Sequence, residues 1–458
     1  MNDIEETAEE TSVKHEEEPA PPQNNYSRKC AHWLLFLSWL VYTVGSLGRM
    51  NYTASIVAII WETGESKTSA GIVSSFFFFA YGAGQLVNGL LCQKYNSRLF
   101  IFGSLILASV ANLCMPFCKT VSAMKWLWLL NGVVQSVLWS SLVKLQSEYL
   151  NDKDVNKSII VMSTTTAAGT FIAYGLSALN VAFFTWRITF YVAAALLVAS
   201  AFALFFGIGY VQKHMPKFVV KKKLPSVGGK RIPAPIILSI CLVCVFAVAN
   251  GLVKDGINTW TPNLLFEVYH IEPHYSIILT LLLPLVSIFG AYLAKLVYKK
   301  LPSDVLLIGI FFVIGGGIAA LILWLYTHTL FGTVAMFAVV SCAIAAVNNL
   351  ITGAIPFRLR TVGRSGFFAG ILNTFCYVGS TLASFLLGML SENSGWNAVI
   401  LLLMCTMLAI SALAFSFSPY WKKKITPLLC EVTTKVWTKN IRLYGNEYGT
   451  QPGSFLLI

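Results

Sequence analysis

Long apolar segments, separated by short polar ones, run through almost the whole chain and constrain its fold more than any other feature. A bilayer with a hydrocarbon core of about 30 Å needs roughly 20 residues of helix to cross it. Backbone polar groups in lipid must be satisfied internally, which leaves helices or closed barrels, and a barrel would show short alternating segments instead. We therefore predict an all-α membrane protein with twelve transmembrane helices, at 32–61, 69–92, 98–117, 124–147, 157–182, 186–211, 235–267, 275–298, 303–327, 329–353, 364–389 and 396–418.

Charge is scarce in this chain and unevenly placed. Charged residues make up 12% of the sequence, whereas a soluble domain carries about 25%. The loops on one side carry most of the basic residues, and these are Lys94, Arg98, Lys153, Lys157, Lys299, Lys300, Arg358, Arg360 and Arg364. The opposite loops are sparser, with Lys67, Lys119, Lys125 and Arg187. By the positive-inside rule, the richer side and both termini are cytoplasmic. The net charge of +13 therefore reflects topology in a cell membrane (plasma or inner) and not a nucleic-acid partner.

The composition changes at both ends and in the middle of the chain. Residues 1–30 begin with an acidic stretch whose composition is typical of disorder. Residues 213–234 contain many lysines, with glycine and proline and no acidic residue, and we predict a cytoplasmic linker there. The linker separates an N-terminal six-helix bundle (31–212) from a C-terminal one (235–418), and residues 419–458 form a cytoplasmic tail.

Two cations interrupt the apolar segments. Arg49 lies deep inside one segment and Lys254 lies deep inside another, about half the chain away. A cation at the centre of a membrane helix costs about 2.5–3.5 kcal/mol on insertion scales. Two such residues indicate a water-filled path between two related halves and an anionic substrate. The guanidinium of Arg49 suits phosphate or carboxylate because its planar fork binds two oxygens; the alternative is a structural arginine held by carbonyls or a carboxylate.

Lys254 is followed directly by Asp255, a carboxylate deep in the same segment. Adjacent helical side chains leave the helix in different directions, so we expect that Asp255 need not neutralise Lys254. A phosphate monoester carries about −1.5 to −2 charges at neutral pH, which matches two cations better than a monocarboxylate does. Asp255 is a candidate for coupling or gating. The alternative is that Asp255 pairs with another cation and that both residues of this pair are structural.

Other polar and aromatic side chains inside the segments are weaker candidates for substrate binding. Each could hydrogen-bond a substrate or could equally join two helices. They are Tyr52, Gln85, Gln135, Trp139, Thr166, Asn373 and Tyr377. Tyr52 follows Arg49 by one helical turn and is expected on its face. The sequence has no Walker phosphate loop, no histidine in the middle of a segment and no recognisable nucleophile–base spacing, so we predict no enzyme, cofactor or metal site.

These motifs resemble those of the organophosphate:phosphate antiporters of the major facilitator superfamily, over roughly residues 30–418. That family's first-helix motif is matched here by the similar residues Arg49-Met50-Asn51-Tyr52. Its seventh-helix motif is matched by Lys254, Gly256 and Trp260-Thr261-Pro262. The resemblance implies two six-helix bundles around a midplane site, two phosphate-binding cations at Arg49 and Lys254, and a monomer. The chain departs from some members at Gln85, where they have lysine, near Thr166, where they have histidine, and at Gln93, where the superfamily has an acid.

The predicted function is therefore exchange of a phosphorylated small metabolite, such as glycerol 3-phosphate or a sugar phosphate, for inorganic phosphate. The mechanism would be alternating access, in which the two halves rock around the site. Two alternatives stay open. One is a carrier of another organic anion coupled to protons through Asp255, and the other is a membrane sensor of sugar phosphate.

Overall fold

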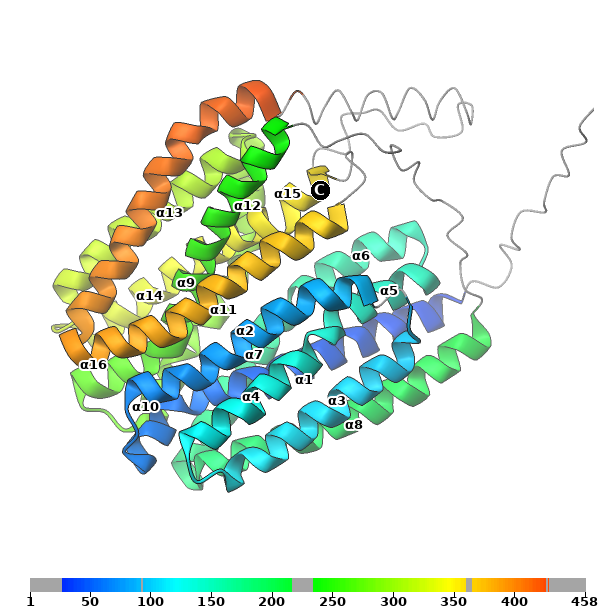
Figure 1. The fold of residues 1–458 in the computed structure, drawn as a ribbon, viewed down its shortest axis with the longest axis horizontal. Coiled ribbons are helices and arrows are strands. Elements are labelled where there is room, and N and C mark those ends of the chain that lie inside the picture. The colour runs from blue at the N-terminus through cyan, green and yellow to red at the C-terminus, as the bar shows by residue number, and fades with distance from the viewer. Residues whose placement is uncertain (1–26, 92–93, 216–233, 360–364, 426, 428–458) are drawn as a thin grey trace, which may run out of the picture.

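The computed structural model describes residues 27–91, 94–215, 234–359, 365–425 and 427, and Figure 1 shows their arrangement. The predicted terminal tails and the linker lie almost entirely outside the described residues, so the domain boundaries stay predictions. Within the described residues, eleven segments are long and apolar enough to cross a membrane. The last of them, Phe368–Ile425, contains Gly395 with φ 76° and ψ 178°, where the helix breaks. Dividing it there gives twelve crossings, which confirms the predicted all-helical fold.

The first part of the chain forms one group of helices (Figure 1). They are α1 (Arg28–Thr63), α2 (Lys67–Leu91), α3 (Ser97–Cys114), α4 (Val121–Gln135), α5 (Val137–Tyr149), α6 (Asp152–Ser163), α7 (Thr165–Phe183) and α8 (Trp186–His214). Helix α1 packs against α7 and α8, and α2 packs against α4. Helices α4 and α5 follow each other within the crossing Val121–Tyr149, and the crossing Val161–Phe183 contains the end of α6 and all of α7.

The second part of the chain forms the other group (Figure 1). Its helices are α9 (Ala234–Tyr269), α10 (Pro273–Thr280), α11 (Leu282–Ser287), α12 (Phe289–Lys300), α13 (Asp304–Leu325), α14 (Leu330–Asn349), α15 (Ile355–Arg358) and α16 (Ser365–Tyr420). Short π-helical turns follow α14 and α16, at Leu350–Ala354 and Trp421–Ile425. The two groups meet mainly where α2 packs against α16 and where α7 packs against α10.

Local sequence signals explain where several helices begin and end. The side chains of Ser27, Asn96 and Thr120 accept hydrogen bonds from backbone N–H groups in the first turns of α1, α3 and α4. Such side chains satisfy donors that have no partner within the helix. Helix α1 ends at Thr63, and the next residue, Gly64, has a φ of 68°, a conformation that glycine adopts without strain.

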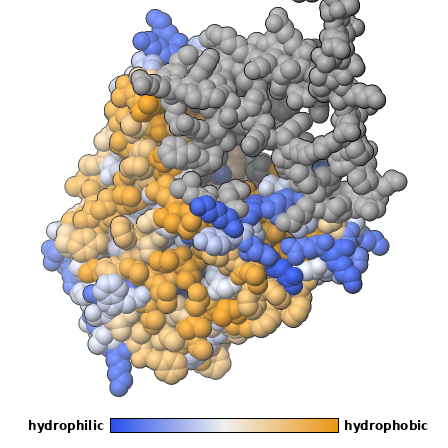
Figure 2. All heavy atoms as spheres, turned by 45° about the vertical axis from the view of Figure 1, so that its right-hand side comes forward, coloured by the Kyte–Doolittle hydropathy of each residue, from blue (hydrophilic) through white to orange (hydrophobic). Residues whose placement is uncertain are grey.

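The surface matches an environment of lipid. Figure 2 shows hydrophobic residues over much of the visible side, with hydrophilic residues mostly toward its margins. Many large apolar side chains are exposed, including Trp324 and Phe331. Exposed apolar surface on this scale would drive aggregation in water, whereas lipid covers it without cost.

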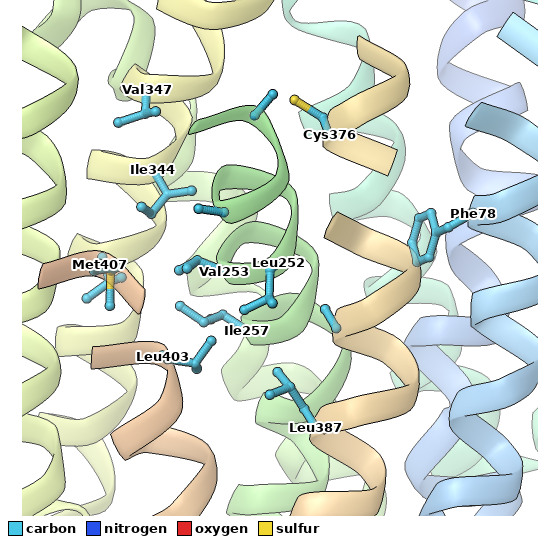
Figure 3. Close-up of a cluster of buried hydrophobic side chains, with 14 of the residues drawn as sticks. Phe78, Leu252, Val253, Ile257, Ile344, Val347, Cys376, Leu387, Leu403 and Met407 are labelled. Atoms are coloured by element: carbon cyan, nitrogen blue, oxygen red, sulfur yellow. The ribbon is translucent and has the colours of Figure 1, made fainter. Parts of the chain in front are cut away.

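Helix α9 is the centre of the second group. Its residues Leu252, Val253 and Ile257 pack among side chains from α14 and α16, while Phe78 approaches α16 from the first group (Figure 3). A Cβ atom built on Gly251 would lie 1.8 Å from the carbonyl oxygen of Cys376. Because no larger residue fits at this contact, the glycine lets α9 approach α16 closely, as small residues do between membrane helices. This contact fixes the position of Lys254 and Asp255, less than two turns further along α9.

Candidate functional site

Arg49 lies well inside α1, in a stretch that neighbouring helices hold in place. The backbone carbonyl of Gly48 accepts hydrogen bonds from the side-chain amides of Asn112 (3.0 Å) and Asn131 (3.1 Å). The amide of Asn51 in turn donates to Asn112 at 2.7 Å. Helices α3 and α4 therefore fix the rotation of α1 on both sides of Arg49, whose side chain is only 3% exposed.

The guanidinium of Arg49 has hydroxyl and ring partners. It donates to the hydroxyl of Ser46 and, over 3.4 Å, to that of Tyr81. Its Cζ atom also lies 4.8 Å from the ring centroid of Tyr42 and 5.3 Å from that of Tyr81. Among the described residues, no carboxylate forms an ion pair with Arg49. Cation–π contacts stabilise the charge without neutralising it, so the site keeps a positive charge that an anion can bind.

Aromatic side chains surround this cation and reach across to the second group of helices. The hydroxyls of Tyr42 and Tyr81 lie 3.3 Å apart. The ring of Trp139 lies 5.1 Å from that of Tyr42, and the ring of Tyr377, on α16, lies 4.8 Å from that of Tyr81. Ser380, one helical turn after Tyr377 on α16, donates a hydrogen bond to Asp255. This part of α16 therefore contacts residues beside both predicted cations.

Sequence reasoning found Trp139 and Tyr377 but missed Tyr42 and Tyr81. A signal for Tyr42 was present, because it precedes Arg49 by seven residues and so lies on the same face of α1. Tyr81 lies on α2, and no pattern in one sequence shows which helix it contacts. Tyrosines are also common in packed helix interfaces, so residue type alone did not separate these two from the others.

Lys254 and Asp255 form an ion pair in this structure, whereas the sequence led us to expect that Asp255 need not neutralise Lys254. The Nζ atom of Lys254 lies 3.5 Å from Oδ2 of Asp255. The same oxygen accepts a hydrogen bond from the hydroxyl of Ser380 on α16. Adjacent helical side chains leave the helix in different directions, but the four-carbon stem of lysine is long and flexible enough to bring its ammonium beside a neighbouring carboxylate. The side chain of Lys254 is 29% exposed, whereas that of Asp255 is 7% exposed.

Gln85 and Asn373 join the two groups of helices beside this cluster. The side-chain amide of Asn373 donates to Oε1 of Gln85 at 2.8 Å. Gln85 follows Tyr81, the partner of Arg49, by four residues and so lies on the same face of α2. Both predicted residues are therefore close to the cation and connect α2 with α16.

The remaining candidates lie away from Arg49's immediate partners. Gln135 is fully buried and donates to the side chain of Asn131 at 2.9 Å, and Asn131 in turn donates to the Gly48 carbonyl of α1. The hydroxyl of Tyr52 donates to the carbonyl of Ala70 at 3.0 Å and its ring packs on Trp128, which places it in the core. Thr166 is exposed at the start of α7. The structure brings none of these three side chains into contact with the guanidinium.

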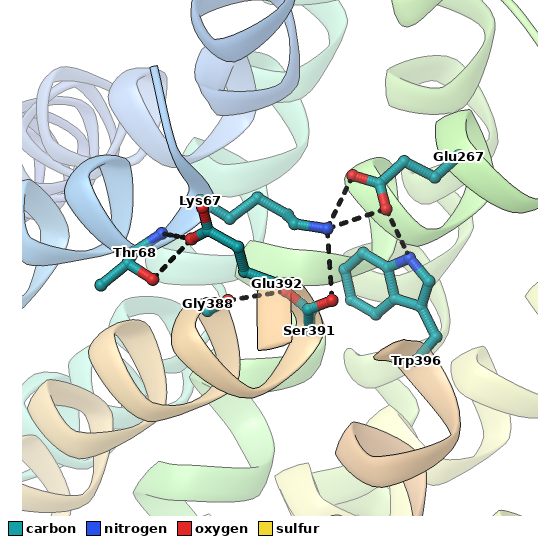
Figure 4. A network of polar contacts seen from close by, with 7 residues as sticks. All are labelled: Lys67, Thr68, Glu267, Gly388, Ser391, Glu392 and Trp396. Carbon is teal, nitrogen blue, oxygen red and sulfur yellow. Dashed lines mark hydrogen bonds and ion pairs between the residues drawn. The ribbon is translucent and has the colours of Figure 1, made fainter. Parts of the chain in front are cut away.

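A second polar cluster joins the groups at the helix ends opposite the basic loops. We name it the Lys67 network, and it consists of Lys67, Thr68, Glu267, Ser391, Glu392 and Trp396 (Figure 4). Lys67 Nζ lies 3.0 and 2.9 Å from the two carboxylate oxygens of Glu267, which also accepts from Trp396 at 2.8 Å. Glu392 accepts from the backbone N–H (3.1 Å) and hydroxyl (2.6 Å) of Thr68. The network ties the start of α2 to the other group.

Comparisons with known proteins agree with this architecture. Residues 38–383 match the model of the Major Facilitator Superfamily. The chain is 24% identical to a protein of Bacillus subtilis (strain 168) named "Glycerol-3-phosphate transporter", over 81% of this chain and 88% of that protein. It is 21% identical to the "Probable hexose phosphate transport protein" of Chlamydia pneumoniae, over 89% of this chain and 94% of that protein.

A solved structure shares the fold. It is a bacterial homologue of the human lysosomal transporter Spinster, in an inward-facing and occupied conformation. The TM-score is 0.66 at 15% identity, and the alignment covers 90% of this chain and 99% of that one. Together with the match over most of its length, this shows that the chain belongs to the Major Facilitator Superfamily and is a multi-pass membrane transporter rather than an enzyme.

Proposed function

We propose that this transporter exchanges a phosphorylated small metabolite for inorganic phosphate across the cell membrane. The observation that carries the proposal is Arg49, a buried arginine deep in a membrane helix whose partners are hydroxyls and aromatic rings. A charge in this setting is costly unless it has a function, and a guanidinium matches phosphoryl oxygens in geometry. The names of the two curated relatives, a glycerol-3-phosphate transporter and a probable hexose phosphate transport protein, support a phosphate ester as substrate.

Lys254 supplies the second cation from the other group of helices. Its side chain is partly exposed and flexible, so it can turn from Asp255 toward an anion bound at Arg49. Tyr42, Tyr81 and Tyr377 lie around the same place and can donate hydroxyl hydrogen bonds to the phosphoryl oxygens. An anion held by both groups of helices draws them together, which is the step that alternating access requires.

The rest of the proposal follows from the topology. The basic loops face the cytoplasm together with both termini, so the Lys67 network joins the two groups of helices on the outer side. The two groups of helices correspond to bundles at 31–212 and 235–418, joined by the linker 213–234. Each chain carries both cations, so a monomer is sufficient for transport.

The test is exchange of radiolabelled phosphate in proteoliposomes that contain the wild type, Arg49→Ala, Lys254→Ala or Lys125→Ala. Lys125 is a matched control because its ammonium lies against the rings of Phe76 and Trp126, away from the site. We expect exchange in the wild type and in the control, and none in the two site variants. Glycerol 3-phosphate, glucose 6-phosphate and other esters serve as competitors, and the ester that inhibits most strongly identifies the substrate.

Three results would contradict the proposal. If folded wild type exchanges no phosphate but takes up another organic anion in a pH-dependent way, the carrier works on that anion. If it binds a sugar phosphate and transports nothing, the protein is a sensor. Exchange that survives loss of Arg49 would place the phosphoryl site elsewhere.

A further inference from the structure

Asp255 is a buried carboxylate that the proposed exchange does not itself need. It lies on α9, in the same group of helices as Lys254, and only 7% of its side chain is exposed. One oxygen, Oδ2, lies 3.5 Å from the Lys254 ammonium and accepts the hydroxyl hydrogen of Ser380. The carboxylate is therefore held by α16 on one side and lies beside the partly exposed Lys254 ammonium on the other.

When no substrate is bound, the positive charges of Lys254 and Arg49 have different neighbours to stabilise them. Lys254 has a full negative charge beside it, whereas Arg49 has only hydroxyls and rings. An opposite charge within about 4–6 Å strongly favours the charged form of a group. Without Asp255, the unloaded protein would carry two uncompensated cations into the closed intermediate through which alternating access passes. With it, one of the two is already neutralised.

We propose that Asp255 is an internal counter-anion, which takes the place of the substrate's phosphoryl group on Lys254 when the site is empty. The consequence, which rests on the proposed function, is that the unloaded transporter can reorient and that net transport accompanies exchange. During binding, Lys254 turns from Asp255 to the phosphoryl group, and the Ser380 hydroxyl continues to hold the carboxylate. During release, Lys254 returns to Asp255 and the empty protein is free to close.

The rate of reorientation tests this without any transport. Dyes attached through genetically encoded amino acids at positions 63 and 328 report the separation of the two groups of helices at one face, because Thr63 and His328 are both exposed there. Single-molecule energy transfer then gives the interconversion rate in the absence of anions. We expect Asp255→Asn to slow it by about tenfold, Asp255→Glu to leave it near the wild-type rate, and inorganic phosphate to restore it in Asp255→Asn.

The double variant Lys254→Gln/Asp255→Asn separates charge compensation from simple damage. Removing both charges should return the anion-free rate to within about threefold of the wild type, although phosphate binding is weakened. Where Asp255→Asn alone does not fold, Lys254→Gln alone serves, because it leaves the carboxylate without its cation and should slow the protein too. Equal rates in the wild type and the single variants, or no recovery in the double variant, overturn the proposal.

A flux measurement adds the transport consequence. Proteoliposomes loaded with labelled phosphate, with membrane potential clamped, are diluted into buffer with phosphate (exchange) or without it (net efflux). We expect the ratio of net efflux to exchange to fall about tenfold in Asp255→Asn. Wild type that exchanges but shows no net efflux contradicts the inference alone. Wild type that exchanges nothing contradicts phosphate exchange, while the interconversion rates still decide the role of Asp255.

Discussion

The hydroxyl of Tyr174, on α7, donates a hydrogen bond of 2.6 Å to the backbone carbonyl of Asn258, on α9. Pro262 explains why this carbonyl is available, because proline has no N–H to donate to the residue four positions earlier in a helix. A carbonyl freed inside a membrane needs another donor, and here the donor comes from the other group of helices. The contact therefore stabilises the conformation in which α7 and α9 are packed together. It does so at the place where Pro262 leaves a backbone carbonyl of α9 without a donor from its own helix.

Replacing Tyr174 by phenylalanine should favour separation of the two groups. The loss of one hydrogen bond between membrane helices is worth about 0.6 kcal/mol on average and up to about 1.7, which corresponds to a shift of roughly 3- to 18-fold in the conformational equilibrium. The shift is measured by energy transfer between dyes at positions 63 and 328. Tyr269→Phe is the control, since its hydroxyl bonds Tyr326 and Thr329 within one group; it should lower thermal stability and leave the equilibrium unchanged.

Pro262→Ala should remove the need for the Tyr174 hydroxyl as a donor to the Asn258 carbonyl. Alanine supplies the missing N–H, so the Asn258 carbonyl regains a partner within its own helix. In a Pro262→Ala background, Tyr174→Phe should then shift the conformational equilibrium by less than about 0.3 kcal/mol, within the error of additive effects. An undiminished effect of Tyr174→Phe would show that the tyrosine acts through ring packing and not through this hydrogen bond.

Arg49→Lys should not be a conservative change. The guanidinium contacts Ser46 and Tyr81 at the same time and still lies over two rings, which a compact ammonium cannot reproduce. We expect phosphate affinity to fall about 10- to 100-fold, as for loss of a bidentate charge-assisted contact of roughly 1.4–2.8 kcal/mol. Isothermal titration in detergent measures the affinity, with Lys125→Ala as control. Unchanged affinity would show that Arg49 acts only as a point charge.

The Lys67 network should lower the population of conformations in which the two groups of helices are separated at its face. Lys67 and Glu267 are 14% and 33% exposed, so their pair is worth about 0.2–1 kcal/mol and weakens with salt. Lys67→Gln should therefore raise the open population about 1.5- to 5-fold, and the exchanged pair Lys67→Glu/Glu267→Lys should recover part of the closure. The readout is energy transfer between dyes at positions 63 and 328, at low and high salt. A swapped pair no better than either single variant would contradict the ion-pair account.

The parts of this structure that sequence could predict are those set by local composition. Hydropathy located the crossings, and a cation within an apolar run pointed to Arg49. Contacts between residues far apart could not be predicted in this way: Lys67 and Glu267 are 200 positions apart. The pairing of Lys254 with Asp255 depends on how a flexible side chain folds back, which neither residue type nor helical spacing determines. Likewise, the difference between Tyr52 in the core and Tyr42 at the cation depends on neighbouring helices.

Glycine at position 251 should be indispensable for packing, in contrast to a glycine that faces outward. The added methyl group of Gly251→Ala would lie 1.8 Å from the Cys376 carbonyl oxygen, so α9 and α16 would have to move apart. Overpacking of this kind costs about 1–3 kcal/mol, more than the roughly 1 kcal/mol that alanine gains over glycine in a helix.

Gly317→Ala is the control, because nothing lies within 4 Å of its Cβ position. Thermal stability in detergent, followed by size-exclusion chromatography, should fall for Gly251→Ala and rise slightly or stay constant for Gly317→Ala. Because Lys254 and Asp255 follow Gly251 on the same helix, a folded Gly251→Ala protein should also lose phosphate affinity. Equal stability of the two variants would mean that the α9–α16 contact is looser than the structure shows.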